Sequence, residues 1–109
     1  MKIEISDHKG KKVMALSGEI DMHESPYLRK ELMALVGKKT TPLVVDFQAV
    51  SYIDSSGIAT FVEGLKGMMA FGGKLQLVSI PAGIMEIFSF SKLDKVFEIH
   101  GSVDDALNS

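Results

Sequence analysis

Four consecutive residues, Asp54-Ser55-Ser56-Gly57, carry the side chains of this chain that are best placed to do chemistry. They follow an apolar run that begins at Leu43, and they precede a helical pattern that begins at Ile58. The first N–H groups of a helix have no partners within the helix, and the helix dipole is positive there, so a side-chain oxygen can cap them and a phosphate is tolerated. The tetrapeptide therefore indicates either a modifiable serine or a helix cap made by Ser55 or Ser56.

Hydrolase chemistry at Ser56 has little support in the sequence. An activated serine needs a base, and the only histidines, His8, His23 and His100, fall in or next to expected turns and strand ends. The tetrapeptide also lacks the leading glycine of the Gly-x-Ser-x-Gly nucleophile elbow. We expect the chain not to be an enzyme, and a small serine hydrolase remains the third alternative for its function.

The sequence also contains no recognisable motif for binding a metal, a cofactor or a nucleic acid. The pairs Asp104-Asp105 and Glu19/Asp21 lack the spacing of metal ligands, and no Gly-Lys-Ser/Thr follows Gly64 and Gly67 to form a phosphate loop. These two glycines are instead expected to permit close helix packing. The net charge of −2 argues against direct binding of a polyanion. We expect no metal, no cofactor and no nucleic-acid partner.

Length and composition predict one cytoplasmic domain. A chain of 109 residues can bury one core, and we expect a single domain that covers residues 1–109. It has no cysteine, which excludes disulfides and thiol catalysis and fits a reducing compartment. No apolar run approaches the roughly eighteen residues of a membrane span, and Glu4 and Asp7 stand where a signal peptide would be apolar.

Hydrophobic spacing and turn residues predict strands that alternate with helices. A hairpin turns at Lys9-Gly10-Lys11, and Ser25-Pro26 starts a helix with the Ser25 hydroxyl as its N-cap. Further strands are expected at 43–47, 74–80 and 96–99, and further helices from residue 58 to just before Gly72, at 81–90, and after Ser102. This alternation predicts right-handed crossovers and a mainly parallel sheet, made mixed by the hairpin.

Four ordered segments match one known family. They are Leu16 to Asp21, Leu43 to Ile58 with the tetrapeptide near its end, Gly72 to Val78, and Asp104 to Leu107. With them the chain resembles a STAS domain, specifically a stand-alone anti-sigma factor antagonist. The resemblance implies an α/β STAS fold, which is a mixed, mainly parallel β-sheet with helices and an N-terminal β-hairpin.

The resemblance also implies a function in partner switching. In the family, an anti-sigma factor that is a serine/threonine kinase phosphorylates the hydroxyl residue directly before the glycine, which here is Ser56. The unphosphorylated antagonist binds the kinase and releases the sigma factor, the phosphorylated form dissociates, and a serine phosphatase restores it. The protein would then be a substrate and a binding module, not a catalyst.

The residues expected to bind the partner are Asp21, Asp54, Ser55 and Gly57. The two aspartates would form an acidic docking surface and repel a phosphoserine, although turn and cap chemistry is an equally open interpretation for each. Ser55 is expected to serve local hydrogen bonding, and Gly57 to leave room for the nucleotide and the kinase.

Two further alternatives stay open. The chain could be a STAS accessory subunit of a phospholipid transporter or of another regulatory complex, without a phosphorylation cycle, and Ser56 would then be only a cap. Met22, Met68 and Met69 could offer an adaptable contact surface, but the apolar stripe of the helix favours a core position for Met68 or Met69.

Overall fold

In the computed structural model, which describes all of residues 1–109, helices and strands alternate after an N-terminal hairpin. The strands are β1 (Lys2–His8), β2 (Lys11–Ile20), β3 (Leu43–Ile53), β4 (Leu75–Val78) and β5 (Glu98–His100). The helices are α1 (Ser25–Gly37), α2 (Ser55–Ala70), α3 (Ala82–Phe90) and α4 (Val103–Leu107), with a 3-10 turn at Leu93–Lys95.

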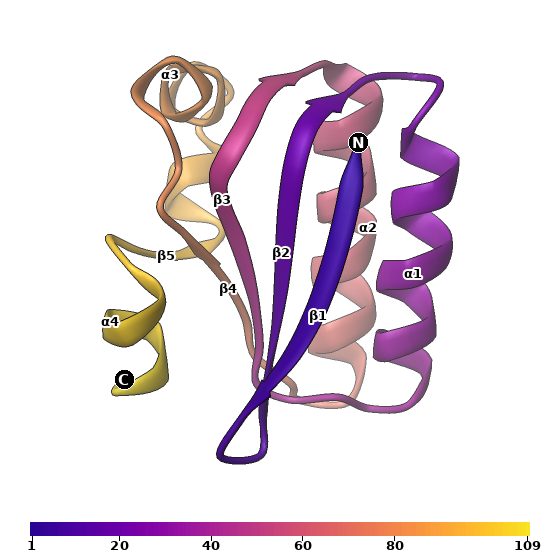
Figure 1. The fold of residues 1–109 in the computed structure, drawn as a ribbon, viewed down its shortest axis with the longest axis vertical. Helices are drawn as coiled ribbons and strands as arrows, with labels where there is room; N and C mark the ends of the chain where they lie inside the picture. The colour runs from indigo at the N-terminus through magenta and orange to yellow at the C-terminus, as the bar shows by residue number, and fades with distance from the viewer.

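The five strands form one sheet in the order of the chain, β1-β2-β3-β4-β5 (Figure 1). β1 and β2 are antiparallel, and the pairs from β2 to β5 are parallel. In the hairpin, Lys9 and Gly10 both have positive φ angles, 55° and 85°, as a two-residue type I′ turn requires. The expected mixed, mainly parallel sheet with an N-terminal hairpin is confirmed.

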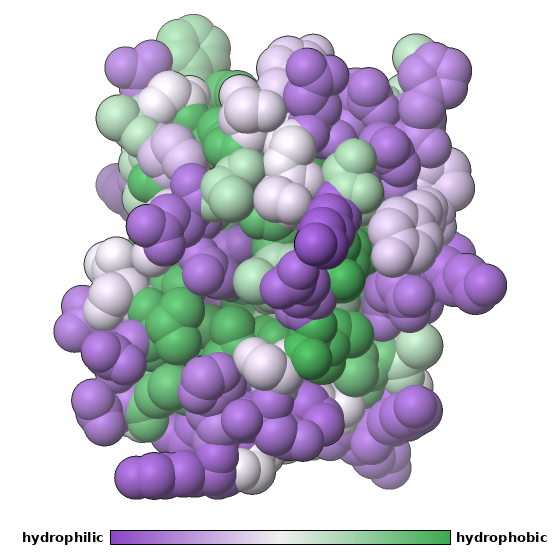
Figure 2. Space-filling view, viewed as in Figure 1, coloured by the Kyte–Doolittle hydropathy of each residue, from purple (hydrophilic) through white to green (hydrophobic).

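Successive side chains of a strand point to opposite faces, and each face of this sheet has its own core. The larger core lies under α1, α2 and α3. In it, the ring of Phe47 packs at a tilt against Phe61 of α2 and edge-on against Phe88 of α3, with ring centroids 5.1 Å and 6.1 Å apart. The smaller core lies under α4, where Val44 packs with Ala106. Figure 2 shows hydrophobic atoms between hydrophilic residues over the lower half of this second face.

α1 and α2 pack closely side by side on the first face (Figure 1). A Cβ atom on Gly64 would lie 2.6 Å from Leu32 Cδ2, and one on Gly67 would lie 2.7 Å from Val36 Cγ1. The prediction that these glycines permit close helix packing is therefore confirmed. The contact brings the first turns of the two helices together, which matters for the site described below.

β3 extends beyond the predicted residues 43–47, because two bulges interrupt the alternating pattern from which its end was predicted. Between Asp46 and Ala49, and again between Val50 and Tyr52, β3 advances one residue more than β2. Each extra residue shifts the alternation, so the inward side chains after Phe47 recur at a spacing of three rather than two. The regular strand pattern ended at residue 47 for this reason, although the strand continues to the residue before Asp54.

Smaller differences from the expected elements occur in the C-terminal half. β5 covers Glu98–His100 rather than 96–99, because Val96 is exposed and precedes the strand. In α3, Ile84 and Phe88 are buried, whereas Ile87 is exposed. None of the four helices combines the length and the apolarity that crossing a bilayer requires.

Candidate functional site

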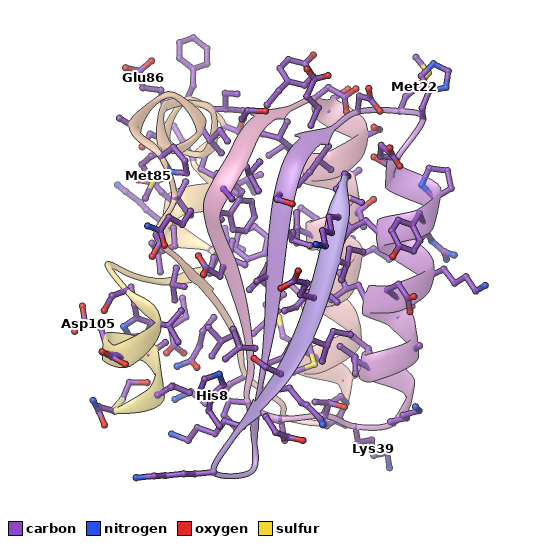
Figure 3. All side chains as sticks on the ribbon, viewed as in Figure 1. His8, Met22, Lys39, Met85, Glu86 and Asp105 are labelled. Carbon is purple, nitrogen blue, oxygen red and sulfur yellow. The ribbon has the colours of Figure 1, made fainter.

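The parallel pairing of β2 and β3 brings the two aspartate segments to one end of the sheet. Ile20 lies opposite Ile53, and the Asp54 N–H donates to the Ile20 carbonyl oxygen at 3.1 Å. Asp21 and Asp54 therefore leave the sheet side by side. Figure 3 shows Met22, the residue after Asp21, at the end of the molecule opposite His8.

Asp54 is the N-cap of α2. Its backbone is extended (φ −107°, ψ −174°), and its Oδ1 accepts hydrogen bonds from the N–H groups of Ser56 at 2.9 Å and Gly57 at 3.2 Å. The expectation that Ser55 or Ser56 caps the helix is wrong, because both already belong to the first helical turn. A cap needs non-helical backbone angles, and Asp54 is the last residue that has them.

The Ser56 hydroxyl sits between two side chains. It donates to Asp54 Oδ1 at 2.5 Å, and its oxygen lies 2.8 Å from the Ser25 hydroxyl oxygen of α1. Ser56 is half-buried, whereas Ser55 is exposed and its hydroxyl makes no hydrogen bond within the chain. The expectation that Ser55 serves local hydrogen bonding is therefore wrong, since Ser56 has that position.

The pKa of Asp54 is lowered from its ordinary value. The hydrogen bond from the Ser56 hydroxyl is the largest cause, burial acts in the opposite direction, and the N–H groups of Gly57, Ser56 and Met22 add to the lowering. Each of these donors stabilises the ionised carboxylate. Asp54 is consequently an anion at neutral pH, in direct contact with the serine hydroxyl.

Ser25 is the residue of this site that the sequence analysis did not identify. Its exposed fraction is 6%, and its hydroxyl lies 2.8 Å from the Asp21 carbonyl oxygen and 2.8 Å from Ser56 Oγ. The prediction that it caps α1 is wrong, because the N-cap residue is Glu24 and no side chain caps there. The available signal was its spacing, since Ser25, Leu28 and Leu32 lie on one inward helix face.

Asp21 organises the loop between β2 and α1. Its Oδ1 accepts from the N–H groups of His23 at 3.0 Å and Glu24 at 3.1 Å, and its carbonyl oxygen accepts from the Ser25 N–H at 2.8 Å. Both aspartates thus carry out turn and cap chemistry, the interpretation that had been left open beside docking. Their expected contact with a partner stays a prediction.

Gly57 is buried at the point where α2 rests on the sheet. A Cβ atom at this position would lie 2.7 Å from Ile53 Cγ1 and 2.8 Å from Ile20 Cγ2. Only glycine lets the helix begin this close to the ends of both strands. This packing fixes the height of Ser56 above the sheet, and the expected role of Gly57 in partner binding stays a prediction.

Below the serine pair, an ion pair also joins the two helices. Arg29 of α1 donates to both carboxylate oxygens of Glu63 of α2, from Nε at 2.8 Å and from Nη2 at 2.6 Å. The hydrogen bond and the charge of Arg29 lower the pKa of Glu63. The pair is solvent-exposed, so it contributes little to the free energy of unfolding. Its two-pronged geometry instead helps to fix the position of α1 relative to α2.

Exposed apolar side chains lie close in the chain to the two aspartates. Met22, which follows Asp21, is 70% exposed, and Tyr52, two residues before Asp54, is 48% exposed. A groove of about 380 Å³ runs from Tyr52 and Ile53 to Ile84 and Ile87 of α3. Of the three methionines proposed as contacts, Met22 and Met69 are exposed and Met68 is buried in the core.

The site offers Ser56 no imidazole base. The two hydrogen-bond partners of its hydroxyl are Asp54 and Ser25. The ring of His8 is hydrogen-bonded to Ser6 and that of His100 to Glu98, and the ring of His23, in the nearby β2–α1 loop, forms no hydrogen bond with Ser56. Asp54 is a weak candidate for a general base, because a carboxylate with a lowered pKa has a low affinity for the proton of the serine hydroxyl. The Ser56 hydroxyl is therefore held by a carboxylate and a second hydroxyl, and no imidazole is hydrogen-bonded to it.

Comparison with known proteins assigns the family. The STAS domain model matches residues 2–106, so the chain belongs to the STAS domain family. The expected α/β STAS fold is thereby confirmed, and the match covers both the Asp21 loop and the Asp54 junction.

Individual relatives are anti-sigma factor antagonists. The anti-sigma-B factor antagonist of Bacillus subtilis is 26% identical over 99 residues, which are 91% of this chain and 90% of that protein. Among solved structures, an anti-sigma factor antagonist from Mycobacterium paratuberculosis has a TM-score of 0.90 at 29% identity, covering 98% of this chain and 91% of that one. The Bacillus cell fate determinant SpoIIAA in its phosphorylated form has the same fold, with a TM-score of 0.77 at 20% identity, covering 98% and 97%.

Proposed function

We propose that this protein is an anti-sigma factor antagonist that works by partner switching. With Ser56 unmodified it binds an anti-sigma factor that is a serine/threonine kinase, and the sigma factor is released. Phosphorylation of Ser56 ends the binding, and a serine phosphatase restores the active form. The protein acts in the cytoplasm as a substrate and a binding module in one domain, and it catalyses no reaction itself.

The observation that carries this proposal is the 2.5 Å hydrogen bond from the Ser56 hydroxyl to Asp54. Phosphoryl transfer forms a bond between Ser56 Oγ and the γ-phosphorus of ATP, breaks the bond to ADP, which leaves with the electron pair, and releases the hydroxyl proton. The serine then has no proton to donate to Asp54, and it carries ~1.5 to 2 negative charges beside that carboxylate. Modification thus replaces an attraction by a repulsion at the surface.

The surroundings of Ser56 support docking of a protein partner. Met22, next to Asp21, and Tyr52, two residues before Asp54, supply exposed apolar area, and Asp54 supplies a fixed negative charge. A partner that buries these side chains must also desolvate the Ser56 oxygen, which a phosphate makes far more costly. Ser55 is exposed at the same helix start, so it lies in reach of a docked partner. Asp21 would add negative charge to the same docking surface.

The relatives support the same assignment. Proteins of nearly the same length, aligned over almost the whole chain, are named anti-sigma factor antagonists. SpoIIAA, which shares the fold, has structures in unphosphorylated and phosphorylated forms. No observation in this structure favours the alternative of a transporter accessory subunit, in which Ser56 would only cap a helix, and here Asp54 is the cap.

Phosphate mapping tests the proposal. The protein is incubated with ATP and the anti-sigma factor kinases encoded in its own genome, and the modified residue is located by mass spectrometry. We expect one phosphate on Ser56, and Ser56→Ala should abolish the incorporation while Ser55→Ala, the matched control, should leave it intact. Phosphate mainly on Ser55, or none with any of these kinases, contradicts the proposal.

A further inference from the structure

A phosphate on Ser56 would find three of the first backbone donors of α2 already occupied. The N–H groups of Ser56 and Gly57 donate to Asp54 Oδ1, and that of Ile58 donates to the Asp54 carbonyl oxygen at 3.1 Å. The sequence predicted that this helix start would tolerate a phosphate. In the structure, however, the Asp54 carboxylate, with its lowered pKa, is the anion that these donors already hold.

Ser25 is the only side chain in contact with the Ser56 hydroxyl that can donate a hydrogen bond. The other partner, Asp54, is an ionised carboxylate and can only accept. The Ser25 hydroxyl has one proton and two acceptors at the same distance, 2.8 Å, namely the Asp21 carbonyl oxygen and Ser56 Oγ. It can therefore turn its proton from one to the other without moving its oxygen.

We propose that Ser25 is a positioning residue for phosphorylation at Ser56. Before the transfer, the Ser25 hydroxyl donates its proton to the Asp21 carbonyl oxygen, and its own oxygen packs 2.8 Å from Ser56 Oγ while the Ser56 proton goes to Asp54. After the transfer, it gives its proton to the phosphoseryl group, which is a stronger acceptor than a carbonyl oxygen. This inference rests on the proposed function, because it assigns Ser25 to the same phosphorylation site.

The position of Ser25 suits this role. With 6% exposure the residue is shielded from water, so a hydrogen bond to a charged group there is stronger than one at the surface. The Asp21 carbonyl oxygen can release the Ser25 proton, because the N–H groups of Glu24 at 3.1 Å and Ser25 at 2.8 Å still donate to it. Phosphorylation would thus remove one hydrogen bond from the loop between β2 and α1, while the two backbone hydrogen bonds to the Asp21 carbonyl oxygen remain.

The test measures the protonation of the phosphate, and it needs no kinase. Phosphoserine is incorporated at position 56 during translation, and the second pKa of the phosphate is followed by 31P NMR titration. A donor stabilises the dianion more than the monoanion, so Ser25→Ala should raise this pKa by about half a unit or more. Asp21 and Asp54 are present in every protein compared, so their charges do not account for a difference.

Two controls decide the outcome. Ser55→Ala removes a neighbouring hydroxyl that makes no hydrogen bond, and it should leave the phosphate pKa unchanged. Ser25→Thr keeps the hydroxyl and Ser25→Val replaces it with a methyl group of similar size, so threonine should retain the low pKa and valine should not. This pair also serves if Ser25→Ala folds poorly. Equal phosphate pKa values with serine, threonine, valine or alanine at position 25 would overturn the role of Ser25, whereas absence of phosphorylation by any kinase would overturn the proposed function alone.

Discussion

The starts of α1 and α2 use the same two residue types for different purposes. Each helix follows a strand of the parallel part of the sheet, and an aspartate precedes a serine at each junction. Asp21 lies in the loop before α1, which begins at Ser25, and Asp54 is the N-cap of α2, in which Ser56 is the second residue. In α1 the serine is four residues from its aspartate and bonds to the backbone carbonyl. In α2 the serine is two residues away and bonds to the carboxylate itself.

This spacing decides which serine is accessible. Four residues make about one helical turn, so Ser25 points inward beneath its own loop and is buried. Two residues place Ser56 at the rim, half-exposed and next to a charge. A buried serine bonded to a carbonyl suits a structural contact, whereas a half-exposed serine bonded to a carboxylate suits a switch, because one added phosphate reverses its local electrostatics.

The largest effect on stability is expected from Gly57→Ala, because it disturbs the packing of the start of α2 against the ends of β2 and β3. The added Cβ would lie 2.7 Å from Ile53 Cγ1 and 2.8 Å from Ile20 Cγ2, so the helix start must shift. We expect a loss of about 1–3 kcal/mol in the free energy of unfolding, measured by urea denaturation. Gly83→Ala in α3, where no atom lies within 4 Å, is the control and should cost nothing. Equal effects of the two substitutions would show that Gly57 is not a packing position.

The charge of Asp54 predicts that the stability contributed by the start of α2 depends on pH. Because folding lowers the Asp54 pKa, its ionised form stabilises the fold above the unfolded pKa of about 3.9, and this contribution is lost as the pH falls through the folded pKa. Asp54→Asn cannot titrate, so the difference in unfolding free energy between wild type and this variant should shrink below about pH 4. Asp54→Ser, which can also cap the helix, should follow the asparagine variant. A constant difference from pH 3 to pH 7 in urea denaturation would contradict the role of the charge.

The smallest effect is expected from removing the Ser56 hydroxyl. Ser56→Ala leaves Asp54 with two N–H donors and Ser25 with the Asp21 carbonyl, so no buried group loses its last partner. The cost should be about 1 kcal/mol or less by urea denaturation, with unchanged circular dichroism. Ser25→Ala should cost more, because it removes a buried side chain that contacts both helix starts. Aggregation of Ser56→Ala, or loss of its helical signal, would mean that Ser56 is chiefly structural.

The sequence predicted the elements and the sheet because those depend on local patterns. Inward spacing marked α1 through Leu28 and Leu32, turn chemistry marked the Lys9-Gly10 hairpin, and Ser102 caps α4 as expected, accepting from the Asp105 N–H at 3.1 Å. The family resemblance implied that Asp21 and Asp54 share one surface, and the structure gives the reason, because the parallel strands β2 and β3 end side by side.

The contact between Ser25 and Ser56 could not be predicted in this way. The two residues are 31 positions apart, and their contact depends on the Ile20–Ile53 register, which β3 reaches only through two bulges, and on the close approach of α1 and α2. Local propensity also gave the wrong cap at both helices. At α2, serine is as good an N-cap as aspartate, and the extended backbone of Asp54 decides between them. At α1, the residue before the helix is Glu24, and no side chain caps there.

The most direct test of the account compares partner binding with and without the phosphate on Ser56. Titration calorimetry with the cognate anti-sigma factor would use the unmodified protein, the protein with phosphoserine incorporated at position 56, and a control with phosphoserine at position 55. A like charge in a desolvated interface costs several kcal/mol, so phosphoserine at 56 should weaken binding about a hundredfold or more, and phosphoserine at the exposed position 55 should weaken it much less. Equal affinities of the unmodified and the Ser56-phosphorylated protein would contradict the switch.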